Sequence, residues 1–203
     1  FSSVISTDIC IIGGGSGGLS IAAGAVQMGA EVTLIEKAEM GGDCLNTGCI
    51  PSKALLAAAK AAYTANGQPA MGVSVSSPPQ IDFAAAKDHV DEVIAGIAPH
   101  DSISRFEGLG VRVLTGAARF AGPAAVIAET ETGPVKITAR YFVIATGSEP
   151  WIPPIAGLSD TPFYTNETIF SLRDAAEHLV IIGGGPIGIE MAQAHIRLGC
   201  RVS

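Results

Sequence analysis

The chain has 203 residues, a net charge of -7 and a sequence pI near 5.0. This length allows one large domain, or one domain and part of another. The composition is 48% hydrophobic and only 15% charged, which provides ample material for a core. The acidic balance argues against nucleic acid or an anionic membrane as the main partner, so chemistry on small molecules is the favoured class of function.

The N-terminal apolar run, Val4 to Ile12, passes directly into glycines without a basic leader. It is too short for a membrane span and lacks the form of a signal peptide, so we expect a cytoplasmic protein with no membrane or nucleic-acid partner. Four cysteines in a chain of this length do not form the disulfide framework of a secreted domain. Their spacing is not that of a zinc site, and no metal site is predicted.

A complete βαβ unit is predicted at the start of the chain. A short apolar strand leads into the segment GGGSGG, and a helix is expected from Leu19 to Met28. Gly29 then forms a turn, and a second strand runs from Glu31 to Ile35. A strand, a glycine-rich turn, a helix and a strand within about thirty residues are typical of a dinucleotide-binding domain.

The glycines of this segment have separate predicted tasks. Gly13 forms the tight turn, Gly15 lets the backbone approach a pyrophosphate, and Gly18 lets the helix pack against the strand. The helix N-terminus supplies amide donors and a positive dipole. Glu36, which ends the second strand, is expected to accept a ribose hydroxyl. An acid at this position disfavours a 2′-phosphate and leaves FAD or NAD.

The segment GGDCLNTGCIPSK, from 41 to 53, places two cysteines five residues apart and a lysine one helical turn beyond. In a regular helix, residues five apart are rotated by about 140° and their Cα atoms are about 8 to 9 Å apart, too far for a disulfide. We therefore expect the helix to be distorted between Cys44 and Cys49, where weak helix formers lie. The pair is interpreted as a redox-active disulfide beside a flavin, and Lys53 shares a helix face with Cys49.

The central part of the chain is predicted to contain helices and then strands. A helix from Ser52 to Ala65 precedes a polar, proline-rich loop, and Pro99 should kink a helical stretch from Phe83 to Gly108. A small antiparallel element is expected next. Its predicted strands are Val111 to Leu114, Ala124 to Thr130, Val135 to Thr138 and Tyr141 to Ala145.

An internal repeat indicates a second nucleotide-binding start. Ile181 and Ile182 lead into GGGPIG, a helix is expected from Ile187 to Leu198, and the strand that begins at Arg201 is cut short. An interrupted βαβ unit suggests the N-terminal piece of a longer protein. The predicted organisation is a FAD-binding domain over residues 1-149, a proline-rich linker over 150-174, and the truncated start of an NAD(P)-binding domain over 175-203. The expected fold class is α/β, with a Rossmann-like parallel sheet and a small antiparallel element.

These motifs resemble those of the flavoprotein pyridine nucleotide-disulfide oxidoreductases, the family of dihydrolipoyl dehydrogenase, glutathione reductase and mercuric reductase. The resemblance rests on four ordered landmarks: GGGSGG, GGDCLNTGCIPSK, ATG at 145 to 147, and GGGPIGIE at 183 to 190. It implies that Cys44 is the interchange thiol, which attacks a substrate disulfide. Cys49 would then be the charge-transfer thiol against the flavin.

The resemblance also implies FAD as the bound cofactor and NAD(P)H as a second cofactor of the complete enzyme. Lys53 would pair with Glu190 near the reactive edge of the flavin ring. The implied substrates are a small-molecule or protein-bound dithiol or disulfide, or Hg(II), and the full-length protein would be a homodimer. The residues expected to contact cofactors are Gly13, Gly15, Ser16, Gly17, Gly18, Glu36, Lys37, Gly42, Lys53, Ala118, Thr146, Gly147, Gly183, Gly185 and Gly188.

Two residues depart from the family pattern. Asp43 stands where most members have a threonine near the FAD phosphates, and an acid is unwelcome there unless it points away. Pro186 stands where several members have a tyrosine lid over the nicotinamide pocket. The family's acid-base histidine belongs to a C-terminal domain, and the four histidines of this chain are expected to be surface or packing residues. The chain alone is therefore not expected to turn over at a normal rate.

Two other functions are open at this point. One is an FAD and NAD(P)H oxidoreductase of another kind that lacks a working disulfide, in which Cys44→Ser would leave activity intact. The other is a non-catalytic flavin-binding or interaction module, which would be a stable, flavin-loaded monomer of this length.

Overall fold

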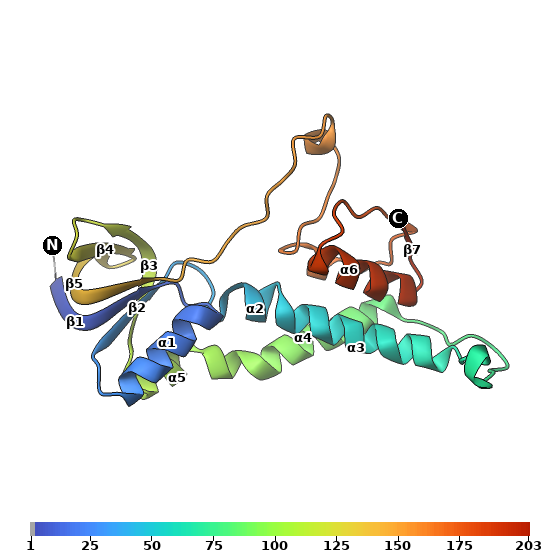
Figure 1. The fold of residues 1–203 in the computed structure, drawn as a ribbon, viewed down its shortest axis with the longest axis horizontal. Helices are drawn as coiled ribbons and strands as arrows, with labels where there is room; N and C mark the ends of the chain where they lie inside the picture. Colours follow the sequence, from blue (N-terminus) through green and yellow to red (C-terminus); the bar gives the residue numbers. More distant parts are fainter. Residues whose placement is uncertain (1–2) are drawn as a thin grey trace. The chain divides into compact units, whose positions relative to one another are not determined.

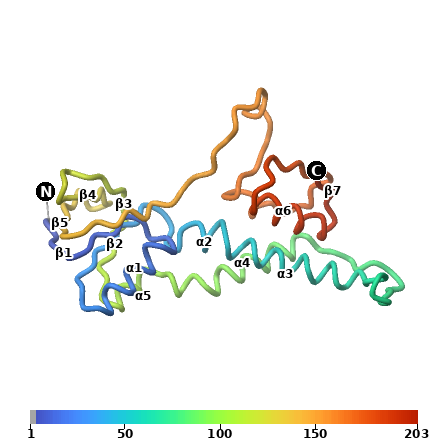
Figure 2. Tube along the Cα trace, in the orientation of Figure 1, coloured from blue at the N-terminus to red at the C-terminus, as the bar shows by residue number. Residues whose placement is uncertain are grey.

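A computed structural model describes residues 3–203, and the chain forms two compact units, each made of two separate segments (Figures 1 and 2). The first unit comprises Phe1–Asn46 and Ile97–Glu149, and the second comprises Thr47–Gly96 and Pro150–Ser203. The chain passes from the first unit to the second between Glu149 and Pro150. Residues Thr47–Gly96 belong to the second unit, so the assignment of residues 1-149 to one FAD-binding domain stays a prediction.

The first unit is built on five strands that pair in the order β1-β2-β3-β4-β5, with β5 pairing again to β1. β1 is parallel to β2 and to β5, and β2 is parallel to β3, so the parallel part has the Rossmann-like order β3-β2-β1-β5. β4 is antiparallel to β3 and β5. The predicted α/β fold class, with a parallel sheet and a small antiparallel element, is confirmed. The strands are β1 Ser3–Ile12, β2 Val32–Glu36, β3 Arg112–Phe120, β4 Ala125–Thr130 and β5 Gly133–Ile144.

β3 and β5 are longer than predicted because each belongs to both parts of the sheet. β3 pairs with β2 up to Thr115 and with β4 from Gly116 onward. A Cβ on Gly116 would lie 2.3 Å from the Glu129 carbonyl oxygen, so only glycine lets β4 approach at this change of partner. The two predicted strands on either side of Arg140 are likewise one strand, which pairs with β1 along its length.

Two apolar clusters cover the two faces of this sheet, because successive strand residues point to opposite sides. Ile11 and Leu34 pack with Phe106 and with residues of α1, Ser16–Gln27. Phe106 lies on α5, Ile103–Gly108. Cys10 and Ile35, their neighbours along the same strands, pack with residues of β4 and β5. Burial on both faces explains the unbroken apolar run at the end of β1.

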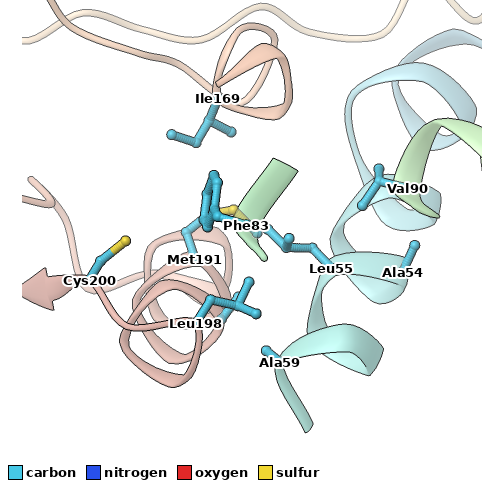
Figure 3. Packing of buried hydrophobic residues seen from close by; sticks show 10 residues of the cluster. Ala54, Leu55, Ala59, Phe83, Val90, Ile169, Met191, Leu198 and Cys200 are labelled. Atoms are coloured by element: carbon cyan, nitrogen blue, oxygen red, sulfur yellow. The ribbon is translucent and has the colours of Figure 1, made fainter. Parts of the chain in front are cut away.

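The second unit is held together by one apolar cluster between three helices: α3 Cys49–Ala65, α4 Phe83–Ile97 and α6 Pro186–Arg197. Figure 3 shows Leu55 of α3, Val90 of α4 and Met191 of α6 around this cluster. Ile169, from the short 3-10 turn Ile169–Ser171, points into it as well. The end of the predicted linker is therefore part of a core.

The remaining predicted elements are largely confirmed. α4 ends at Ile97, and Pro99 lies in the 3-10 turn Ala98–Asp101 that separates it from α5. α6 begins at Pro186, since proline suits the first helical position. The parallel strands β6, His178–Leu179, and β7, Arg201–Val202, flank α6 as the second nucleotide-binding start predicts. Over residues 3–203, no helix combines the length and the apolar character needed to cross a membrane.

Two ionisable side chains are fully buried in the second unit, at Lys87 and His195. The Lys87 Nζ donates to the Ile169 carbonyl at 3.0 Å and lies 5.2 Å from the centroid of the Phe170 ring. Burial, followed by the nearby charge of Arg173, lowers the pKa of Lys87 to about 8. His195 packs with its ring centroid 5.8 Å from that of Phe83, as expected of a packing residue. Its Nδ1 is 2.8 Å from the Met191 carbonyl oxygen, while its buried Nε2 has no hydrogen-bond partner in the described part of the chain.

We expect Lys87→Met to remove part of the pH dependence of stability. The pKa of Lys87 is about 8 in the folded chain, below its ordinary 10.5, so the unfolded chain binds the proton more tightly. The free energy of unfolding of the wild type should therefore rise by up to about 3 kcal/mol as the pH increases from about 8 to 10.5. The variant should lack this rise. Urea unfolding from pH 7.5 to 10 measures it. Lys60→Met, at an exposed position on α3, is the control, and equal slopes for wild type and Lys87→Met would contradict the prediction.

Candidate functional site

The first glycine-rich loop joins β1 to α1 and has no room for side chains at two positions. Gly13 has a φ of 112°, and a Cβ there would lie 2.1 Å from the Ala145 carbonyl oxygen. A Cβ on Gly18 would lie 1.9 Å from the Gly13 carbonyl oxygen. α1 follows at Ser16 with no side-chain cap, which leaves its first-turn N–H groups available to phosphate oxygens. The loop therefore has the form of a dinucleotide cradle.

Glu36, at the end of β2, accepts hydrogen bonds from two backbone N–H groups, one of which belongs to this loop. Its Oε2 accepts from the Gly14 N–H at 2.5 Å, and its Oε1 accepts from the Ala38 N–H at 2.7 Å. A carboxylate has about four acceptor sites, so both oxygens can still accept a ribose hydroxyl. The acid that the sequence predicts for the ribose is thus held in place, while the neighbouring Lys37 is exposed.

The cysteine motif begins directly against the glycine loop. The Gly41 N–H donates to the Gly14 carbonyl at 2.9 Å, and Gly15 and Gly41 form a parallel β-bridge. A Cβ on Gly42 would lie 2.8 Å from the Gly15 Cα. The helix α2, Gly42–Asn46, then carries the half-buried Cys44. The predicted pyrophosphate loop and the helix that carries Cys44 are therefore joined by backbone contacts.

Most of the other predicted FAD contacts lie beside this loop. Ser16 and Gly17 are exposed on the first turn of α1, and Thr146 and Gly147 are exposed just after β5. Ala118 is placed differently, on β3 opposite Ala128 of β4 and half-buried against the cluster of Cys10 and Ile35. The departure from the family pattern, Asp43, is an exposed side chain in the first turn of α2.

The helix is interrupted between the two cysteines, as their spacing predicts. α2 ends at Asn46 and α3 begins at Cys49, and between them Gly48 has φ -128° and ψ -111°. Cys49 is the exposed first residue of α3, in the second unit. Lys53 follows one turn later on the same helix and is exposed as well.

Lys53 forms the ion pair with Glu190 that the resemblance implies. The Lys53 Nζ lies 2.5 Å from the Glu190 Oε1, and the Ser52 hydroxyl donates to the other carboxylate oxygen. The hydrogen bond from Lys53, followed by that from Ser52, holds the pKa of Glu190 below its usual range. Ser52 is the site residue that the sequence analysis missed, because a partner 138 residues away leaves no local signal. The role of the pair beside a flavin stays a prediction.

The second glycine-rich loop repeats the geometry of the first. Gly183 has a φ of 114°, and a Cβ on Gly188 would lie 2.3 Å from the Gly183 carbonyl oxygen. Gly183 and Gly185 are exposed, and α6 starts directly after Gly185. Pro186 has no N–H, so phosphate oxygens at this helix N-terminus would use the amides of Ile187 and Gly188. Among residues 3–203, no three His, Cys, Asp or Glu side chains gather to hold a metal ion.

Two cradles of this kind, each between a strand and a helix, define a dinucleotide-binding α/β protein. The family model for the pyridine nucleotide-disulphide oxidoreductases matches residues 7–203, and the chain therefore belongs to this family. Mercuric reductase from Streptomyces lividans is 36% identical over 197 residues, which is 97% of this chain and 42% of that protein. Mercuric reductase from Shewanella putrefaciens is 37% identical over 201 residues, which is 96% of this chain and 35% of that protein.

The solved structures agree with this assignment. The HOCl-induced flavoprotein disulfide reductase RclA from Escherichia coli has a TM-score of 0.80 and 28% identity, over 96% of this chain and 41% of that chain. Its Cu(II) complex has a TM-score of 0.81 over 97% of this chain. The chain spans less than half the length of these relatives. Membership of the family implies FAD and NAD(P)H as cofactors, and the open cradle at Gly13 and Gly18 fits a dinucleotide.

We expect Gly18→Ala to destabilise the protein by about 1 to 3 kcal/mol and to reduce FAD binding, because the added Cβ meets backbone that cannot move aside. Thermal unfolding and the ratio of FAD to protein after reconstitution measure both effects. Gly24→Ala is the matched control on the same helix, because nothing lies within 4 Å of its added Cβ, and it should not reduce stability. Wild-type stability and FAD content in Gly18→Ala would rule out the close packing described here.

Proposed function

We propose that this chain is the FAD-binding, redox-cysteine part of an NAD(P)H-dependent flavoprotein that transfers two electrons to a disulfide or to Hg(II). The observation that carries the proposal is the backbone attachment of the Cys44 helix to the first glycine loop, through Gly41 and Gly14. This attachment supports a cofactor and a reactive thiol held within the same compact unit. A homodimeric, cytoplasmic full-length enzyme is part of the same proposal.

Each part of the first loop has a proposed task in holding FAD. The three glycines at 13, 15 and 18 admit the pyrophosphate, the first turn of α1 donates N–H groups to it, and Glu36 accepts from a ribose hydroxyl. When bound, FAD supplies the two-electron link between NAD(P)H and a Cys44–Cys49 disulfide. The thiol-exchange steps are carried out by side chains of the protein.

Reduction of a substrate disulfide then proceeds by thiol exchange. Cys44, as a thiolate, attacks one substrate sulfur, forms a mixed disulfide and releases the first substrate thiol. Cys49 attacks the Cys44 sulfur, releases the second substrate thiol and re-forms the Cys44–Cys49 disulfide. With a dithiol such as dihydrolipoamide as the substrate, the same exchanges run in reverse.

The names of the relatives support two substrate classes. Several relatives are mercuric reductases, and RclA is named a disulfide reductase and has been solved as a Cu(II) complex. A pair of thiolates suits soft metal ions as well as disulfides, so one cysteine pair can serve both substrates.

The other two cysteines have no part in the proposed chemistry. Both lie in cores, and burial raises the pKa of the Cys10 thiol to about 11. Burial also raises the pKa of the Cys200 thiol. A thiol that stays protonated is a poor nucleophile, so neither competes with Cys44 and Cys49 near neutral pH.

We expect the FAD-loaded protein to develop a long-wavelength thiolate-to-flavin absorbance band when it is titrated with a dithiol under nitrogen. Cys49→Ser should lose this band. In the full-length enzyme, Cys44→Ser should lower the rate of disulfide or Hg(II) reduction by about a thousandfold or more, because it removes the attacking nucleophile. Cys10→Ser is the control and should retain both the band and the activity.

Two results would favour the other functions. Full activity in Cys44→Ser, with FAD bound, would indicate a flavin oxidoreductase that works without a disulfide. A full-length protein that is a stable monomer, holds FAD and reduces neither substrate would indicate a non-catalytic flavin-binding module.

A further inference from the structure

Two neighbouring residues of α3 hold the two oxygens of the Glu190 carboxylate. Ser52 is 6% exposed and donates its hydroxyl to Oε2, whereas the Lys53 side chain is 62% exposed and binds Oε1. We propose that Ser52 is a positioning residue, which orients the Glu190 carboxylate and, through it, the Lys53 ammonium for electron transfer at the flavin. The flavin part of this inference rests on the proposed function.

The helix geometry places Ser52 and Lys53 differently relative to Glu190. Consecutive helix residues point about 100° apart, so Ser52 and Lys53 cannot both face α6 directly. The short, buried Ser52 is the one that faces α6, and the longer Lys53 reaches the same carboxylate from the exposed side. An exposed lysine pair is weak alone, because water screens it and the flexible chain loses freedom. The buried hydroxyl therefore sets the orientation of the carboxylate.

The Ser52 hydroxyl donates a hydrogen bond to a residue distant in sequence, whereas a serine within a helix commonly donates to a carbonyl of its own helix. On α1, the Ser20 hydroxyl donates to the Ser16 carbonyl, four residues earlier, at 2.7 Å. Such back-bonding is the usual choice of a serine within a helix. The carbonyl four residues before Ser52 belongs to Gly48 and accepts the Ser52 N–H at 3.0 Å, while the Ser52 hydroxyl goes to Glu190.

Both ends of this contact stand on packed helices. Leu55, just beyond Lys53, is fully buried, and Met191, next to Glu190, is 6% exposed in the same cluster (Figure 3). The positions of the two backbones are therefore fixed by apolar packing. Because the backbones cannot shift to compensate, loss of the hydroxyl should free the carboxylate to rotate. The Lys53 ammonium would then follow the carboxylate or turn to solvent.

The first test needs no cofactor. Carbon-detected NMR of labelled protein measures the pKa of the Glu190 carboxyl, which is held below its usual range. We expect this pKa to rise in Ser52→Ala, because a donor to the charged form is lost, and to stay low in Ser52→Thr, which keeps a hydroxyl. Ser20→Ala, which removes a hydroxyl that bonds only within its own helix, is the matched control. An unchanged Glu190 pKa in Ser52→Ala would overturn the proposal.

The second test uses the FAD-loaded full-length enzyme. We expect Ser52→Ala to slow flavin reduction by NAD(P)H by about tenfold with KM unchanged, because Ser52 acts on the reacting geometry and not on nucleotide binding. In a Lys53→Gln background, Ser52→Ala should add no further loss, since its effect passes through Lys53. An equal further loss in that background would overturn the proposal.

The two tests separate this proposal from the proposed function. A wild-type protein that binds no FAD would overturn the proposed function and, with it, a role for Ser52 in electron transfer. FAD binding and reductase activity that are insensitive to Ser52→Ala would overturn the Ser52 proposal alone.

Discussion

The first unit depends on a place where backbone meets backbone with no side chain between. A Cβ at Gly13, Gly18 or Gly42 would overlap the backbone of another segment. The three close approaches dock α1 on the sheet, seat the end of β5 beside the loop and place the Cys44 helix against the same loop. One steric requirement therefore explains the fold of this unit, its open cradle and the location of its thiol. A side chain at any of these three glycines would overlap backbone atoms of the neighbouring segment, and packing elsewhere cannot relieve that overlap.

In the second unit, an apolar cluster between helices holds polar side chains in position. α3, α4 and α6 meet through residues such as Leu55, Val90 and Met191. Within this frame Lys87 donates to the Ile169 carbonyl, and the Glu190 carboxylate meets Ser52 and Lys53. Burying an amine is unfavourable unless a partner is supplied, and the partner of Lys87 comes from a segment distant in sequence. The carboxylate of the proposed active site is thus held by the same packing that stabilises the unit.

Much of the site could be predicted because glycines and paired cysteines leave local patterns. The tight turn at Gly13 and the interruption of the helix before Cys49 follow from spacing and conformational preference, and both are present. Other features were invisible in the sequence. Nothing local indicates that Lys87 is buried or that the Ser52 hydroxyl leaves its own helix, because both depend on contacts more than eighty residues away. The lengths of β3 and β5 were underestimated for a similar reason, since each gains a second partner only in the assembled sheet.

The sequence by itself determined the class of fold, the two dinucleotide-binding starts and the family. The fold class, the two starts and the family can be recognised from short-range periodicity and glycine spacing, because these patterns involve only a few neighbouring residues. The tertiary structure decided which side chains cooperate. It joined Gly41 to Gly14 and brought Ser52 and Lys53 to one carboxylate on α6. Such contacts depend on how helices and strands pack, and packing is set by the whole apolar surface of each element and not by any motif within it.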